Sequence, residues 1–262
     1  MSGPVAVHHL VAGPLDAPVL VLIPSLGTDL GVWEPQVPAL ARACRVIRYD
    51  TRGHGRSPVP EGPYTLADLG ADLLGLLDRL GIGRADLCGL SIGGMAAMWA
   101  AAHAPERVGR LTLLCTSAWL DREVYARRAD LVRRAGLASV ADGVVGRWFT
   151  PGFAQREPDR VAAARRMLLA TPAEGYAGSC EAIAAMDLQP DLWRILAPTL
   201  IVAGADDLAI PPGHAERLAA NIAGSRLAIV PQAAHLANVE RPAAVTALIA
   251  AHLGVDGSEE AV

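Results

Sequence analysis

The fold is best read from residues 85–108, ADLCGLSIGGMAAMWAAAHAPERV. The composition of this stretch changes in its middle. A short apolar run passes through Gly-Leu-Ser-Ile-Gly-Gly at 89–94 and continues as an alanine-rich segment without a helix breaker until Pro105. This pattern predicts a buried strand that turns directly into a helix, with Ser91 in the turn. A turn this tight strains the serine backbone and exposes its hydroxyl at the N-terminus of the helix, where amides stabilise negative charge. Ser91 is therefore a candidate nucleophile, the alternative being an ordinary turn residue.

Apolar, β-branched runs recur along the chain and alternate with helical patterns. The runs are 19–23, 44–49, 85–90, 110–115, 198–204 and 225–231. Continuous apolarity suggests strands covered on both faces, as in a parallel sheet. Between two of them, leucines recur three and four residues apart over 66–80, after a candidate capping box of Thr65 and Asp68. The alternation predicts an open α/β fold with a mostly parallel sheet flanked by helices.

The segment 121–195 breaks this alternation, since it holds arginine-rich helical patterns and no convincing strand. We interpret it as a helical cap inserted into a core domain made of 1–120 and 196–262. An insertion at the carboxyl end of a sheet is well placed to cover a ligand site. The alternative is that these helices only extend the core. The last seven residues, DGSEEAV, look frayed.

The composition excludes several classes of function. All 23 basic residues are arginines, and without lysine the chain cannot form the Schiff base that pyridoxal phosphate needs. The net charge of -4, without a basic block, argues against nucleic acid as the main partner. The four cysteines are widely spaced, without a CxxC pair, and are interpreted as reduced packing residues; no metal site is predicted. No apolar run reaches the roughly 18 uncharged residues of a membrane span, and the start lacks a signal-peptide pattern, so we expect a cytoplasmic protein.

A serine nucleophile needs a base, and the base needs an orienting acid. Among the seven histidines, His235 follows the last predicted strand, in a loop where it could lie over Ser91. The loop after 198–204 offers Asp206 and Asp207 as the acid, and both could instead be solvated charges. We favour Asp207, because it ends a Gly-x-x-Asp stretch with proline four residues later. Many enzymes that use a serine, a histidine and an acid in this way share that pattern. The chain order is then Ser, Asp, His.

An oxyanion in such a reaction needs two backbone donors. One should be the amide of Ile92, the residue after the nucleophile. The other should come from the loop after 19–23, PSLGTDLGVW, and we assign it to Leu26.

Several stretches together resemble the 3-oxoadipate enol-lactonases of the α/β-hydrolase superfamily. They are PSLGTDLGVWEPQ, RYDTRGHGRSPVPEGPYTLADLGADL, GLSIGGMAA, GRWFTPGF, EGYAGSCEAIAAMDL and AAHLANVERP. The resemblance spans nearly all of 20–253 and implies a sheet of about eight strands with a helical cap, no cofactor, and opening of an enol-lactone in aromatic-acid degradation. Many members begin the oxyanion loop with His-Gly, whereas this chain has Pro24-Ser25; backbone donation survives that departure. His54, in RYDTRGHGRS, matches a scaffold position and is interpreted as structural.

The resemblance also points to cap residues that meet the substrate. Trp148 resembles a cap tryptophan that faces the substrate, although it could equally pack the cap onto the core. The lactone carries a carboxymethyl group, and burying this carboxylate requires a cation or several donors. Among the cap arginines, we expect Arg133, Arg134 or Arg147 to supply it.

Two other functions fit the same residues. One is a general carboxylesterase or cofactor-independent perhydrolase of the same fold, because a triad does not choose a substrate. The other is a non-enzymatic ligand receptor that keeps the pocket of a hydrolase. The enzyme readings all imply a small lactone or ester as the partner, and the sequence leaves the oligomeric state open.

Overall fold

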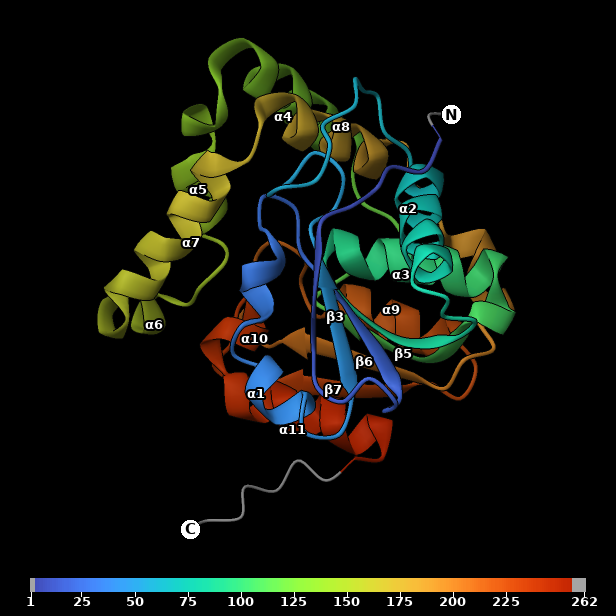
Figure 1. The fold of residues 1–262 in the computed structure, drawn as a ribbon. Helices are drawn as coiled ribbons and strands as arrows, with labels where there is room; N and C mark the ends of the chain where they lie inside the picture. The colour runs from blue at the N-terminus through green and yellow to red at the C-terminus, as the bar shows by residue number, and fades with distance from the viewer. Residues whose placement is uncertain (1–2, 256–262) are drawn as a thin grey trace.

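The computed structural model describes residues 3–255, which form a central sheet covered by helices (Figure 1). The strand order is β1-β3-β2-β4-β5-β6-β7, in which β1 runs antiparallel to β3 and every other neighbouring pair is parallel. The strands are β1 (His9–Ala12), β2 (Val19–Ile23), β3 (Arg45–Tyr49), β4 (Ala85–Leu90), β5 (Val108–Leu114), β6 (Thr199–Gly204) and β7 (Arg226–Val230). The predicted α/β fold with a mostly parallel sheet is confirmed.

The sheet has seven strands within residues 3–255, one fewer than the eight that the resemblance implies. The chain before β1 bonds to core side chains, and the His8 carbonyl also accepts the Asp50 amide directly after β3. The Val5 amide donates to Asp72 at 2.7 Å, and the His8 amide donates to the Ser57 hydroxyl at 2.9 Å. These contacts satisfy the backbone amides of Val5 and His8. The end expected to fray, 256–262, lies outside the described residues.

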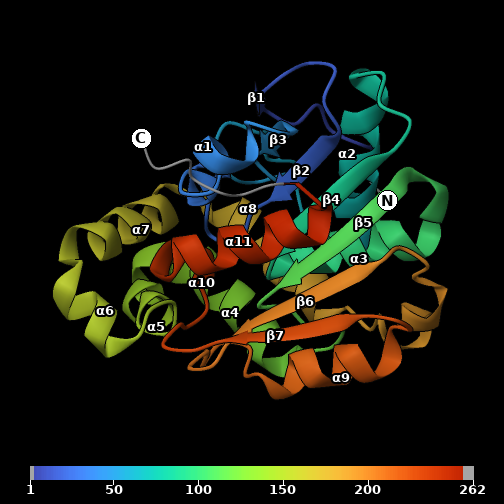
Figure 2. The same cartoon turned by 90° about the horizontal axis from the view of Figure 1, so that it is seen from below.

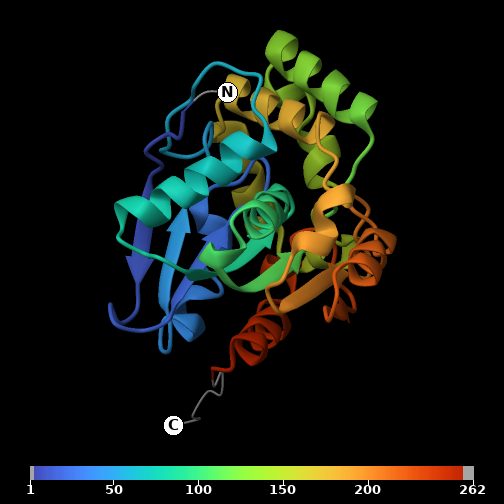
Figure 3. The same ribbon diagram turned by 90° about the vertical axis from the view of Figure 1, so that its right-hand side faces the viewer.

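Helices cover both faces of the sheet. Figure 2 shows α11 (Pro242–Leu253) across one face, where α1 (Val37–Leu40) packs against it. Figure 3 shows α2 (Leu66–Arg79) and α3 (Ile92–His103) on the opposite face, and α9 (Gly213–Asn221) packs against β6 and β7. The predicted capping box opens α2, since Thr65 and Asp68 each accept the other's backbone amide. Within residues 3–255, no helix is both long and apolar enough to cross a bilayer.

The chain between β5 and β6 forms a group of helices above the carboxyl ends of the parallel strands (Figure 1). We call these helices the cap: α4 (Arg122–Ala135), α5 (Ala141–Val145), α6 (Pro151–Arg156), α7 (Pro158–Ala170) and α8 (Ala173–Ala184), with short 3-10 turns at Leu137–Ser139 and Gln189–Arg194. Helices α4 and α8 pack along each other. The division into a core of 1–120 and 196–262 and a cap domain of 121–195 stays a prediction.

Candidate active site

Ser91 occupies the turn between β4 and α3, with φ 56° and ψ -118°. A positive φ is strained for a residue with a side chain, and the neighbouring glycines make the turn possible. A Cβ at Gly89 would lie 2.3 Å from the Gly93 carbonyl oxygen, and a Cβ at Gly93 would lie 2.4 Å from that of Ile23. The Thr116 hydroxyl donates to the Ser91 carbonyl at 2.7 Å, which holds the turn against the end of β5.

His235 and Asp207 form a buried pair, with His235 4% and Asp207 2% exposed. The His235 Nδ1 lies 2.8 Å from Asp207 Oδ2, and because a carboxylate only accepts, Nδ1 donates. Asp207 Oδ1 accepts the amides of Ala209 at 2.8 Å and Ile210 at 2.9 Å. Both carboxylate oxygens are thus fixed, and Nε2 of His235 is left to accept a proton. The structure brings Asp207 to the histidine, whereas Asp206 is exposed.

Ser91 and His235 line one small cavity beneath the cap, together with Ser25 and Leu26. Its volume is about 30 Å³, room for one or two water molecules. Within residues 3–255, the amide of Leu26 donates to no acceptor, and neither does that of Ile92, the first residue of α3. The Ser25 hydroxyl is also buried without a partner in the described part of the chain. The cavity therefore offers unpaired donors beside the serine.

The loop that carries Leu26 is held by two side chains from the end of β3. His54 Nε2 accepts the Gly27 amide at 3.0 Å, and its Nδ1 lies 3.1 Å from the Arg52 carbonyl. Asp50 Oδ1 accepts the Leu30 amide at 2.8 Å. Burial lowers the pKa of His54, which fits a neutral ring that donates from Nδ1 and accepts at Nε2. The sequence indicates a structural role for His54 but does not show which groups it contacts.

Of the four cap residues named from the sequence, two line the cavity. Trp148 is 3% exposed and lines it beside Arg147. Arg133 is engaged elsewhere: its guanidinium donates to Glu174 at 2.8 and 2.9 Å and to Glu181. Arg134 is exposed and also lies outside the lining. The structure therefore brings only Trp148 and Arg147 of these residues toward Ser91.

Arg128 also lines the cavity, and sequence analysis missed it. Its guanidinium carbon lies 4.8 Å from the centre of the Tyr125 ring. Burial opposes the charge of Arg128, but electrostatic interactions with Tyr176, Tyr125 and Cys180 outweigh burial and raise its pKa. The signal was helical spacing, because 125, 128, 129 and 132 share one face of α4 and Ala129 and Val132 are buried.

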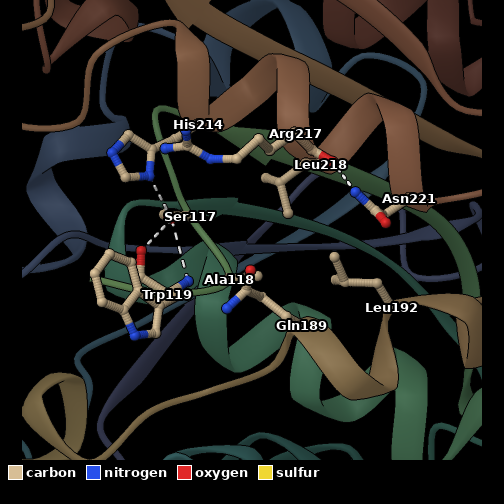
Figure 4. A pocket seen from close by; sticks show the side chains of 9 residues that line it. All are labelled: Ser117, Ala118, Trp119, Gln189, Leu192, His214, Arg217, Leu218 and Asn221. Atoms are coloured by element: carbon tan, nitrogen blue, oxygen red, sulfur yellow. Dashed lines mark hydrogen bonds between the residues drawn. The ribbon is translucent and has the colours of Figure 1, made fainter. Parts of the chain in front are cut away.

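A second serine and histidine meet in the pocket shown in Figure 4, outside this cavity. The Ser117 hydroxyl lies 2.7 Å from His214 Nδ1, and it donates to the Trp119 carbonyl at 2.7 Å. Burial, aided by Arg217, lowers the pKa of His214. Within residues 3–255, no carboxylate hydrogen-bonds to His214, and no group of three His, Cys, Asp or Glu side chains could hold a metal ion. This pair lacks the acid that orients a catalytic base.

Residues 18–242 match the family model described as alpha/beta hydrolase fold. The chain belongs to the α/β-hydrolase family. The order of Ser91, Asp207 and His235 in the chain is also the order in which this family carries its triad.

Known α/β-hydrolases that are similar to this chain include two enol-lactonases. It is 41% identical over 241 residues to 3-oxoadipate enol-lactonase 2 of Acinetobacter baylyi, covering 92% of this chain and 90% of that protein. The crystal structure of the enol-lactonase from Burkholderia xenovorans LB400 is 44% identical, with a TM-score of 0.93 and coverage of 95% and 96%. A proposed carbamate hydrolase, RutD, of Stutzerimonas stutzeri is 30% identical over 257 residues, 94% of this chain and 96% of RutD. The resemblance to the enol-lactonases is confirmed.

Proposed function

We propose that this α/β-hydrolase opens the ring of 3-oxoadipate enol-lactone to give 3-oxoadipate, by a serine mechanism. The observation that carries the proposal is the meeting of Ser91 and the His235–Asp207 pair at one cavity, beside the unpaired amide of Leu26. Action on an ester or lactone is supported by the two enol-lactonases that the chain is similar to. The same proposal includes a cytoplasmic location and a role in aromatic-acid degradation.

The first half of the reaction acylates Ser91. His235 Nε2 takes the proton of the serine hydroxyl while the serine oxygen attacks the lactone carbonyl carbon. The amides of Ile92 and Leu26 donate to the oxyanion that forms on the carbonyl oxygen. Asp207 holds the histidine ring by Nδ1 and stabilises its positive charge.

The remaining steps complete the acylation of Ser91 and then release the product. When the tetrahedral intermediate collapses, the bond from the carbonyl carbon to the ring oxygen breaks and an enolate leaves. The enolate oxygen takes the proton from His235, and the resulting enol tautomerises to the ketone. An enolate is a better leaving group than an alkoxide. His235 then takes a proton from water, the hydroxide attacks the acyl carbon, and Ser91 regains its proton as 3-oxoadipate departs.

The cavity also has groups for the substrate carboxylate. We assign this role to Arg128 and Arg147, because both line the cavity with Ser91 and His235. A guanidinium that donates to a carboxylate forms a charge-assisted hydrogen bond, about twice as strong as a neutral one. Trp148 then covers the ring. Since a cavity of about 30 Å³ is far smaller than a lactone, the cap side chains must move when the substrate enters.

A general esterase or perhydrolase, a carbamate hydrolase and a ligand receptor remain the competing functions. Two arginines at one small cavity favour an anionic substrate over a neutral ester or carbamate. The test is the specificity constant, kcat/KM, for 3-oxoadipate enol-lactone, for its methyl ester and for a simple aryl acetate. We expect the free acid to be preferred over its methyl ester by roughly 10- to 150-fold, the value of one charge-assisted contact. Equal constants would favour the general esterase, and binding without turnover would favour the receptor.

A further inference from the structure

Glu240 is a buried carboxylate that this mechanism does not use. It is 6% exposed and ends α10 (Ala237–Glu240), the short helix that follows His235. In the part of the chain that the structure describes, no arginine or histidine forms an ion pair with it. A buried carboxylate without a cation is costly unless several donors compensate for the lost water. The donors that bond to the Glu240 carboxylate therefore indicate its role.

The donors come from two segments far apart in sequence. Glu240 Oε2 accepts the amide of Ala234, the residue before His235, at 2.9 Å. Oε1 accepts the Thr150 hydroxyl, and the Thr150 amide lies 3.3 Å from both oxygens. Thr150 begins the cap helix α6, where its hydroxyl oxygen also accepts the Phe153 amide. One carboxylate thus joins the histidine loop to the cap.

A second contact joins the same two segments. The amide of Leu236, the residue after His235, donates to the Trp148 carbonyl at 2.9 Å. The histidine is therefore flanked on both sides by bonds to 148–150, directly or through Glu240. Trp148 and His235 also line the same cavity. A displacement of either segment changes the position of the tryptophan relative to the base.

We propose that Glu240 is a positioning residue, which sets the orientation of His235 toward Ser91 and links it to the cap through Ala234 and Thr150. It has no contact with the substrate in this role. The inference rests on the proposed function, because it presumes that Ser91 and His235 carry out the chemistry.

Substitutions can remove one side of this link at a time. In Glu240→Gln the side chain keeps one acceptor oxygen, and its amide group places a donor against an N–H of Ala234 or Thr150. Thr150→Val removes the hydroxyl but keeps the shape and the carboxylate, whereas Thr150→Ser keeps the hydroxyl and serves as its control. Asp86→Asn is the matched control for a lost carboxylate, because Asp86 accepts the Arg110 amide at 2.6 Å at the opposite end of β4 from Ser91.

The experiment measures how fast a small fluorophosphonate inactivates the full chain, together with kcat and KM for the lactone. Phosphonylation of the serine oxygen expels fluoride and needs the histidine base, but not the cap groups that bind the substrate. We expect Glu240→Gln to slow inactivation and kcat by the same factor, roughly 10- to 100-fold, since small displacements of reacting groups cost this much. KM should change less than kcat, because Glu240 bonds to Ala234 and Thr150 and not to Arg128 or Arg147. Thr150→Val should be inactivated more slowly than the unmodified chain. A variant that carries both Glu240→Gln and Thr150→Val should be little slower than Glu240→Gln alone, because both substitutions break the same bond between Glu240 and Thr150.

The outcomes separate positioning from plain stability. Thr150→Ser and Asp86→Asn should be inactivated at the rate of the unmodified chain, even if Asp86→Asn has a lower Tm. A folded Glu240→Gln variant with an unchanged inactivation rate would overturn the proposal. If Glu240→Gln does not fold, equal rates for Thr150→Val and Thr150→Ser would overturn it instead, and a slower Thr150→Val would support it. An unmodified chain that resists the reagent would refute the proposed function, and the inference with it.

Discussion

Among single residues, the neighbouring aspartates Asp206 and Asp207 differ sharply in their contacts. Asp207 places one oxygen on His235 and the other on two backbone amides, whereas Asp206 is exposed. Asp207→Asn should lower kcat by roughly 10⁴, because an amide in this place favours the wrong histidine tautomer. Asp206→Asn should stay close to the unmodified enzyme. Steady-state kinetics on both variants test the choice, and the reverse order of effects would reject Asp207 as the acid.

The arginines give a second prediction at this scale. Arg128 and Arg147 line the cavity, and Arg134 does not. Arg128→Ala or Arg147→Ala should lower kcat/KM for the enol-lactone by roughly 10- to 150-fold and change kcat/KM for its methyl ester much less. Arg134→Ala is the control and should behave as the unmodified enzyme. An equal loss on both substrates would mean that the arginine shapes the cap and does not bind the carboxylate.

Among the elements, the loop after β3 supports the loop that carries Leu26 through a neutral histidine. His54 accepts the Gly27 amide at Nε2, and burial lowers its pKa. A lowered pKa means that the unfolded chain takes up the proton first as the pH falls. The stability that neutral His54 contributes is therefore fully present above the ordinary pKa of about 6.5 and is lost below it, toward the lowered value of the folded state.

His54→Gln tests this account of the loop. A glutamine can donate to the Arg52 carbonyl and accept the Gly27 amide, but it does not titrate. Urea unfolding between pH 8 and pH 5 should show that the unmodified chain loses more free energy of unfolding on acidification than His54→Gln does. His214 and His252, whose pKa values burial also lowers, remain in both proteins and cancel in the difference. Identical pH dependence would show that His54 is not held neutral.

The elements that the sequence predicts best are those with a local pattern. The turn at Ser91 follows from glycines whose Cβ atoms would clash, and α2 follows from its leucine spacing and capping box. The spacing of Arg128, Ala129 and Val132 can be seen in the sequence, but the packing of α4 decides which of its faces is buried. The link from Glu240 to Thr150 joins residues 90 positions apart, and no local pattern specifies such a contact.

In the molecule as a whole, the core and the cap both contribute residues to the cavity. The core sheet places Ser91, Asp207 and His235 at the ends of its strands, and the cap adds Arg128, Arg147 and Trp148 over them. In the proposed function, the chemistry therefore depends on core residues, and the preference for an anionic substrate depends on cap residues.

The proposed function depends above all on Ser91 as the nucleophile. The decisive measurement is the turnover of 3-oxoadipate enol-lactone by a folded Ser91→Ala variant. Circular dichroism and Tm first establish that the variant folds. We expect kcat to fall by roughly 10⁴ to 10⁶, because only the oxyanion donors and substrate binding then remain. A folded Ser91→Ala variant that opens the lactone at a rate near that of the unmodified enzyme would contradict the role of Ser91 as the nucleophile.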